Sequence, residues 1–325
     1  MTRLNRRHLL VGAASGIATY SVGFAQDRYP NKPIRMLVPW TAGTPADIAA
    51  RSVADSLGAG LGQAVYVDNK NGAAGTVAVS EALRAPADGY TIYVLASASL
   101  VSPVLYPASE INFVKQFDPV GQLEWSYNVL CVSPKKPYKT VADLVSAIKA
   151  NPGRISYASG GNGTPPHLAG EMLNIDANLK TIHVPYVQMG QAATDVMTGL
   201  ADFIFMGAAG SVPLIKGGRL RPLAVSASKR VAALPDVPTM VESGFPNFVI
   251  RPFDGLLVKK GTASDIVGRL NTQLNKVLAS PTVQERFAGI GMEAAPTSPQ
   301  EFGKLVESES ARWIALARQA RLTIS

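Results

Sequence analysis

The 325-residue chain contains one cysteine and three histidines, too few for the chemistry that clusters of these residues support. A lone thiol cannot form an internal disulfide, and Cys131 lies in an apolar run where a thiol is usually packed. One histidine belongs to the leader described below, and the other two, His167 and His183, lack the spacing of zinc ligands. The sequence therefore predicts no metal site, no cofactor and no redox chemistry.

Several functional motifs are also missing. Neither G-x-G-x-x-G nor G-x-x-x-x-G-K-[ST] occurs, and no G-x-S-x-G elbow is present. The longest apolar run outside the leader, residues 203–215, contains Gly207, Gly210 and Pro213, so it does not predict a membrane span. Basic residues are spread along the chain without the basic and aromatic stripe of a nucleic-acid site.

The first 25 residues predict a secretory leader. Basic residues precede an apolar stretch over residues 9–22, and small residues allow cleavage near Ala25. Arg6 and Arg7 resemble a twin-arginine signal, although general secretion fits as well, and no cysteine is present for a lipid anchor. Without the three leader arginines the net charge falls from +8 to +5, an excess that favours small anionic solutes.

Residues 34–50 predict a strand, a loop and a helix. The strand over residues 34–38 ends at Pro39, and residues 47–57 have apolar side chains at helical spacing. The backbone N–H groups of the small-residue loop between them could hold a carboxylate or phosphate in the field of the helix dipole. The same pattern also fits an ordinary turn in which Thr44 or Asp47 caps the helix.

Two further strands, over residues 64–67 and 90–95, alternate with helices to predict a parallel sheet with right-handed crossovers. Ligands of such sheets lie beyond the carboxyl ends of the strands. Ser97 and Ser99 follow the third strand, so they should share this edge with the first loop.

A second α/β region begins near residue 128, after a looser pattern over residues 117–127. Strands are predicted over residues 128–132, 155–158, 182–184, 203–206 and 223–226, and Thr140 with Asp143 predicts a capping box. The loop over residues 159–167 contains three glycines and is a second candidate for holding an anion. Residues 248–258 lead back to the first region, and residues 263–324 predict helices broken at residues 280–281 and 296–299. Two α/β lobes joined by two crossings, with a cleft between them, are therefore expected.

Several motifs together resemble one family, the Bug-type extracytoplasmic solute receptors of tripartite tricarboxylate transporters. They include A-P-A-D-G-Y-T at residues 85–91, the loop that leads into H-L-A-G-E at residues 167–171, H-V-P-Y at residues 183–186, and L-P-D-V-P-T at residues 234–239. The resemblance covers nearly the whole chain after the leader.

This resemblance implies a type II-like, two-lobed periplasmic binding fold that closes on a small carboxylate and delivers it to a membrane permease. Residues 1–25 would be the leader, residues 26–124 and 250–325 lobe one, and residues 125–249 lobe two. The family's first loop usually reads P-F-x-x-G-G-x-x-D, whereas Trp40 and Thr44 replace its phenylalanine and second glycine here. Residues 187–189 also depart from the family pattern, so the identity of the carboxylate is left open.

The two loops and the adjoining strand ends define the predicted ligand site. Its residues are Trp40, Thr41, Ala42, Gly43, Thr44, Asp47, Ser97, Ser99, Ser159, Gly160, Gly161, Asn162, Thr164, His167, Tyr186, Gly190, Gly207 and Phe253.

Aromatic residues on the first loop and at the crossings favour one class of ligand. Trp40, Trp125, Tyr127 and Phe253 could sandwich a flat ring, which suggests an aromatic dicarboxylate such as terephthalate or another phthalate-type acid. Hinge packing is the favoured explanation for each aromatic residue taken singly, and aliphatic di- or tricarboxylates and amino acids stay open as ligands. Arg251 could pair a second carboxylate, or form an exposed or inter-lobe salt bridge.

Two other functions compete with solute transport. A periplasmic hydrolase could use Ser159 with His167, although no acid that would orient the histidine is evident nearby. A receptor that presents its closed lobes to a signalling system would need the same cleft as a transport receptor. We interpret His167 as a neutral group that shapes its loop, and His183, on an apolar strand, as a core residue.

Overall fold

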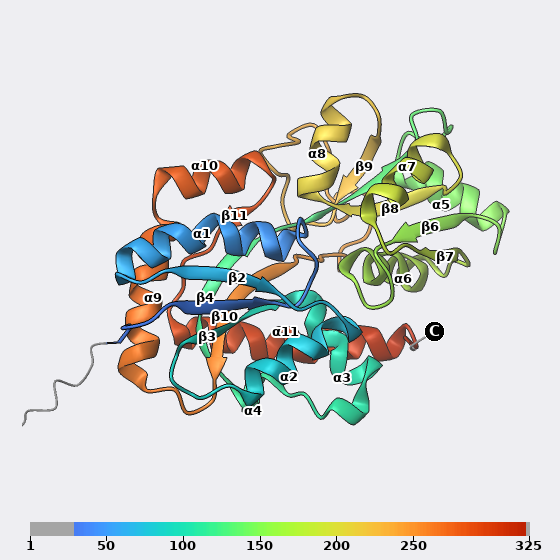
Figure 1. The fold of residues 1–325 in the computed structure, drawn as a ribbon. Helices are drawn as coiled ribbons and strands as arrows, with labels where there is room; N and C mark the ends of the chain where they lie inside the picture. The colour runs from blue at the N-terminus through green and yellow to red at the C-terminus, as the bar shows by residue number, and fades with distance from the viewer. Residues whose placement is uncertain (1–28, 323–325) are drawn as a thin grey trace, which may run out of the picture.

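The computed structural model describes residues 29–322, so the predicted leader and its cleavage near Ala25 lie outside the described residues. The chain forms two α/β lobes side by side, each built around its own sheet (Figure 1). The strand order is β11-β4-β10-β3-β1-β2 in the first sheet and β7-β6-β8-β5-β9 in the second. The predicted two-lobed α/β fold is confirmed.

The first sheet starts from the predicted parallel unit. Strand β1 (Ile34–Val38) lies between β2 (Val65–Asn69) and β3 (Thr91–Ala96) and is parallel to both. The connecting helices are α1 (Pro45–Leu61) and α2 (Thr76–Arg84). Because β1 and β3 run in the same direction, the segments that follow them lie at one edge of the sheet.

Strand β10 (Phe253–Lys259), which is antiparallel to both of its neighbours, and strand β4 (Phe117–Trp125) complete the long strands of this sheet. Strand β10 lies between β3 and β4. The looser sequence pattern over residues 117–127 thus contains a nine-residue strand that was not predicted. Its pairing with β10 shifts register twice, and the buried polar residues Gln122 and Glu124 interrupt the alternation by which strands are recognised.

The first strand of the second sheet is β5 (Asn128–Val132). It lies between β8 (Phe203–Gly207) and β9 (Arg221–Val225) and is antiparallel to both. On the far side of β8, β6 (Ser156–Ser159) and β7 (Ile182–Pro185) are parallel to each other. The helices of this lobe are α5 (Val141–Ala150), α6 (Pro165–Ala177), α7 (Met189–Thr198) and α8 (Ala208–Lys216). The capping box at the start of α5 is present as predicted, with both hydrogen bonds formed.

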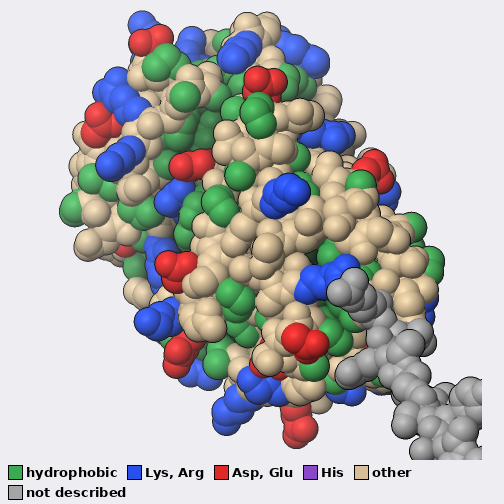
Figure 2. All heavy atoms as spheres, turned by 90° about the vertical axis from the view of Figure 1, so that its left-hand side faces the viewer, with side chains coloured by type: hydrophobic (Ala, Val, Ile, Leu, Met, Phe, Trp, Pro, Cys, Tyr) green, Lys and Arg blue, Asp and Glu red, His purple; other side chains and the backbone are tan. Residues whose placement is uncertain are grey.

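The remaining elements belong to the first lobe. They are η1 (Ala73–Gly75), η2 (Ser97–Val101), α3 (Ser102–Leu105), η3 (Pro107–Ser109), α4 (Phe113–Gln116), α9 (Ser264–Leu278), α10 (Pro281–Gly289), β11 (Glu293–Ala294) and α11 (Pro299–Gln319). The break between α9 and α10 occurs where the sequence predicts it. The break before α11 begins at residue 290, earlier than the predicted residues 296–299, because β11 pairs with β4 there. Within residues 29–322, no helix has both the length and the apolar character of a membrane span. Charged side chains of both signs are interspersed over the face of the first lobe shown in Figure 2.

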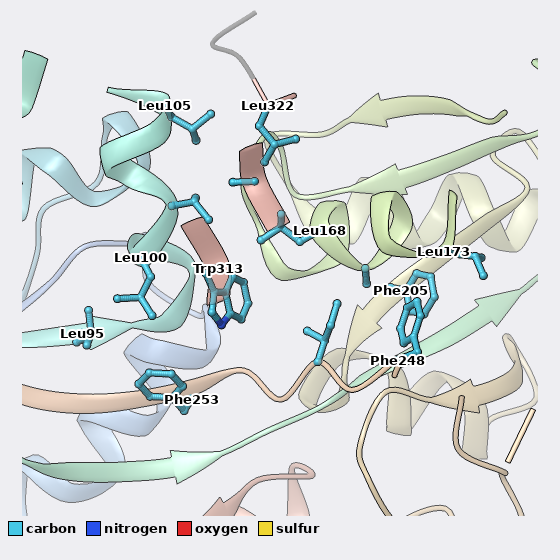
Figure 3. Close-up of a cluster of buried hydrophobic side chains, with 14 of the residues drawn as sticks. Leu95, Leu100, Leu105, Leu168, Leu173, Phe205, Phe248, Phe253, Trp313 and Leu322 are labelled. Carbon is cyan, nitrogen blue, oxygen red and sulfur yellow. The ribbon is translucent and has the colours of Figure 1, made fainter. Parts of the chain in front are cut away.

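A buried apolar cluster continues from one lobe into the other (Figure 3). Trp313 of α11 lies between Leu100 of the first lobe and Leu168 of α6 in the second. The crossings are also joined by hydrogen bonds, since the Ser126 N–H donates to the Pro252 carbonyl at 2.8 Å and the Ser226 hydroxyl to the Ile250 carbonyl at 2.6 Å. These contacts keep the two lobes together, while the residue boundaries between the lobes stay a prediction.

Candidate functional site

The first predicted loop is a tight turn at the start of α1. The N–H and hydroxyl groups of Thr44 both donate to the Thr41 carbonyl, at 3.3 and 2.8 Å. Gly43 has a φ of +83°, in the left-handed region that glycine adopts without strain, and its N–H donates to Asp47 Oδ2 at 2.9 Å. Asp47 therefore reaches back from the first turn of α1 to hold the loop.

The Asp47 carboxylate is fully engaged within the protein. Only 2% of this residue is exposed, and Asp47 Oδ1 accepts hydrogen bonds from Arg51 at 3.0 Å and Asn69 at 2.9 Å. The Asn69 amide also donates to the Trp40 carbonyl at 2.9 Å. Arg51 thus balances the negative charge of Asp47, and the hydrogen bonds of Asp47 stabilise the first predicted loop.

The second predicted loop repeats this design in the other lobe. The N–H and hydroxyl groups of Thr164 donate to the Gly161 carbonyl at 3.3 and 2.7 Å. Gly163 has a φ of +78°, and its N–H donates to His167 Nδ1 at 3.1 Å. Gly43, Thr44 and Asp47 of the first loop thus correspond to Gly163, Thr164 and His167 of the second.

Both turns leave the helix after them without a side-chain cap. Thr44 and Thr164 are the N-cap residues of α1 and α6, but neither hydroxyl binds a first-turn N–H, because each is turned back into its own loop. In Figure 1, α1 begins at the boundary with the second lobe. No side-chain cap therefore occupies the N-terminal end of either helix, where the dipole favours an anion.

The loop amides are less free than the sequence suggests. The N–H groups of Gly43, Gly161 and Gly163 are used inside the loops. Within the described part of the chain, the N–H groups of Ala42 and Gly160 have no acceptor. The N–H groups left for a ligand are therefore these two and those in the first turns of the helices.

Ser97 and Ser99 are buried in the 3-10 helix η2. The Phe253 N–H donates to Ser97 Oγ at 3.2 Å, and the Tyr93 hydroxyl donates to Ser99 Oγ at 3.3 Å. Both hydroxyls thus brace the edge of the first sheet. Phe253 itself is buried and packs edge-on against Trp125, with ring centroids 5.5 Å apart.

Helix η2 lies between the two predicted loops. A Cβ atom on Gly75 would lie 2.8 Å from Ser99 Oγ and 3.1 Å from Pro39 Cβ, so η2 reaches the end of β1. A Cβ atom on Gly163 would lie 2.7 Å from Val101 Cγ2, so the other end of η2 touches the glycine-rich loop. The end of β1 and the glycine-rich loop thus both lie close to this short helix.

The sequence does not reveal the conformation of residues 72–75, which are predicted only as a flexible turn. Four consecutive residues have positive φ, at 141° for Gly72, 46° for Ala73, 51° for Ala74 and 89° for Gly75. Left-handed backbone costs on the order of 1–3 kcal/mol for a residue other than glycine and concentrates at binding sites. This segment packs beside η2 and is an additional candidate for the site. Only the flanking glycines signal it in the sequence.

Ser159 pairs with His183, not with His167 as the hydrolase alternative supposes. Ser159 Oγ lies 2.6 Å from His183 Nε2 and also accepts the Gly161 N–H at 3.0 Å. Because Ser159 is wholly buried, its hydroxyl is not placed to attack a substrate. Burial lowers the pKa of His167 to about 3, with His183 as a smaller cause, and burial lowers the pKa of His183 to about 4. Both rings are therefore neutral near pH 7, as interpreted for His167.

The other predicted residues of the second lobe lie at the ends of its strands. The Tyr186 hydroxyl, after β7, donates to Asp195 at 2.8 Å, Gly190 is exposed at the start of α7, and Gly207 ends β8. Asn128 pairs with Gly207 across the sheet, and its buried Nδ2 has no hydrogen-bond partner among the described residues. This donor is another candidate that the sequence did not suggest.

The four aromatic residues proposed to sandwich a ring are not all brought together. Trp125 and Tyr127 line a cavity of about 500 Å³ at the β9 and β11 edges of the sheets, and none of the predicted ligand residues lines it. The Arg251 guanidinium stacks over Trp125 at 4.4 Å and pairs with Glu293 at 3.2 Å, which is the salt-bridge alternative predicted for it. Trp40, half-buried on the first loop, is the aromatic residue nearest in sequence to the open end of α1.

The described residues contain no group of three or more His, Cys, Asp or Glu side chains arranged to hold a metal ion.

Comparison with known proteins adds family evidence. The sequence pattern described as "Tripartite tricarboxylate transporter family receptor" matches residues 49–322. Protein BugT of Bordetella pertussis is 31% identical over 320 residues, which cover 97% of this chain and 98% of BugT. An R. palustris protein solved with adipate is 30% identical with a TM-score of 0.84, covering 91% of this chain and 100% of that one. MatC from Rhodopseudomonas palustris, solved with bound malate, is 27% identical with a TM-score of 0.80, covering 89% and 99% of the two chains.

Proposed function

The chain belongs to the tripartite tricarboxylate transporter receptor family, and from this membership we propose that it binds a small dicarboxylate between its lobes and delivers it to a membrane permease. The family consists of solute-binding receptors rather than enzymes, and similar solved structures are named as periplasmic binding and transport proteins. The leader predicted over residues 1–25 supports export of this chain to the same compartment.

One observation carries the proposal. Each lobe presents a strand, a threonine turn and an uncapped helix, at α1 in one lobe and at α6 in the other. A carboxylate at either helix end meets a favourable dipole field, and because Pro165 and Pro166 of α6 carry no N–H, its donors in the second lobe come mainly from the loop. A ligand with two carboxylates can engage both ends at once, so it favours the arrangement in which the lobes are closed.

The finer identity of the ligand is proposed from the first loop. The relatives described above were solved with adipate and with malate, which are aliphatic dicarboxylates. Here Trp40 stands on the loop that precedes α1, and its ring, which packs partly against the apolar core of the first lobe, leaves some aromatic surface exposed at that loop. We therefore propose an aromatic dicarboxylate such as terephthalate as the preferred ligand of this chain.

A thermal-shift screen of residues 26–325 with terephthalate, phthalate, adipate and malate tests the proposal. A ligand at 100 times its Kd stabilises the folded state by about 2.7 kcal/mol, a readily measured shift. Terephthalate should give the largest shift. A larger shift with adipate or malate would keep the receptor function and refute the aromatic preference, whereas no shift with any of the four acids would contradict dicarboxylate binding.

A matched pair of variants locates the site. Ala42→Trp fills the exposed first loop and should abolish the shift, while Ala59→Trp places the same side chain on an exposed position near the other end of α1 and should leave it intact. Equal shifts in both variants would show that the acid binds elsewhere.

A further inference from the structure

The glycine-rich loop of the second lobe rests on a column of aromatic rings. His167 stacks on His183 with centroids 3.8 Å apart and planes at 5°, and His183 stacks on Tyr157 at 4.9 Å. Tyr157 in turn lies 5.6 Å from Phe203. The four rings come from α6, β7, β6 and β8, so the column joins the elements that surround the loop.

Each imidazole is connected to a different amide of the loop. The Gly163 N–H donates directly to His167 Nδ1 at 3.1 Å. The Gly161 N–H donates to Ser159 Oγ at 3.0 Å, and that hydroxyl shares a 2.6 Å hydrogen bond with His183 Nε2. Gly161 and Gly163 have φ values of +106° and +78° and would otherwise be conformationally free.

We propose that His183 is a positioning residue, which holds the glycine-rich loop in its binding conformation through the Ser159 hydroxyl. With Gly161 anchored in this way, the neighbouring Gly160 N–H, which has no acceptor in the described protein, is held in one orientation for a ligand carboxylate. This inference rests on the proposed function and assigns a supporting role in that site to a residue that the sequence places in the core.

Packing alone does not account for this histidine. His183 lies on the edge strand β7 and is only partly buried. An apolar ring of similar size would fill the same space in the column. The neutral imidazole adds one thing that such a ring lacks, a nitrogen at hydrogen-bond distance from Ser159.

Three variants separate positioning from packing. His183→Phe keeps an aromatic ring in the column and removes the nitrogen, whereas His183→Gln carries a polar atom at similar reach. Tyr157→Phe is the control, because it removes a hydrogen bond of the same column that leads to Glu171 and not to the loop.

The first measurement needs no ligand. Amide hydrogen exchange in peptides covering residues 159–164 should be at least threefold faster in His183→Phe than in the wild type and close to wild type in His183→Gln and Tyr157→Phe. Unchanged exchange in His183→Phe would overturn the proposal, and so would fast exchange that His183→Gln fails to slow, because the ring would then act by packing.

The second measurement is titration calorimetry with terephthalate and adipate. Loss of one hydrogen bond should weaken binding of either acid by about three- to tenfold in His183→Phe, with recovery in His183→Gln. If exchange accelerates as expected but the wild type binds neither acid, the positioning role stands and the dicarboxylate function fails. If His183→Phe binds as tightly as the wild type, the loop does not hold the ligand through this contact and the proposal is refuted.

Discussion

Replacement of Asp254 by asparagine should stabilise the protein at alkaline pH, because Asp254 and Glu124 are buried side by side on neighbouring strands. The two residues face each other across β10 and β4, with 5% and 1% of their surfaces exposed. Burial raises the pKa of Asp254 to about 7, an effect that a hydrogen bond with Glu124 opposes. Burial, and then the neighbouring Asp254, raises the pKa of Glu124, which the Arg251 guanidinium lowers only as a minor cause.

The sign follows from the raised pKa. An unfolded aspartate ionises near pH 3.8, whereas the folded Asp254 keeps its proton until about pH 7. Asp254 therefore does not change the free energy of unfolding below pH 3.8. It lowers that free energy progressively as the pH rises from 3.8, and by the full amount above pH 7. About three pKa units at 1.36 kcal/mol each correspond to a cost on the order of 4 kcal/mol, which a neutral asparagine removes.

The assay is urea unfolding of the wild type, Asp254→Asn and the control Asp236→Asn, an exposed position, at pH 5 and pH 8.5. Comparing variants cancels the contribution of other titrating groups. The gain from Asp254→Asn should be larger by about 2–3 kcal/mol at pH 8.5 than at pH 5, while the control shows no such difference. An equal gain at both pH values, or a loss that grows with pH, would refute the reasoning.

Three further outcomes are expected. Gly163→Ala should destabilise the fold by about 1–3 kcal/mol more than Gly153→Ala in urea unfolding, because both glycines have positive φ but only the first would place a Cβ atom against Val101, at 2.7 Å; equal costs would contradict the contact. Trp40→Ala should weaken terephthalate binding about fivefold more than adipate binding in calorimetry, since only an aromatic ligand can use the ring; equal losses would remove Trp40 from the ligand contact. Burial raises the pKa of the Cys131 thiol, so a thiol-specific reagent should label it only in urea, and labelling of the native protein at the unfolded rate would contradict its burial.

Local interactions made much of the fold predictable from the sequence. The capping box of Thr140 and the apolar spacing of the helices involve residues three or four positions apart, so their geometry is contained in the segment itself. The position of the first loop beyond β1 could also be predicted, because crossovers between parallel strands have one hand and bring such loops to one edge.

Other features depend on residues that only folding brings together. Ser159 meets His183 because β6 and β7 pair in parallel, with Ser159 opposite Pro185, whereas His167 is nearer in the sequence but accepts a loop amide instead. Glu124 and Asp254 are 130 positions apart, and each reads as an ordinary polar residue until the strands meet. Composition and periodicity describe a segment's own preferences. Which partners its side chains find across a sheet or between lobes is decided by register and topology, and these belong to the whole chain.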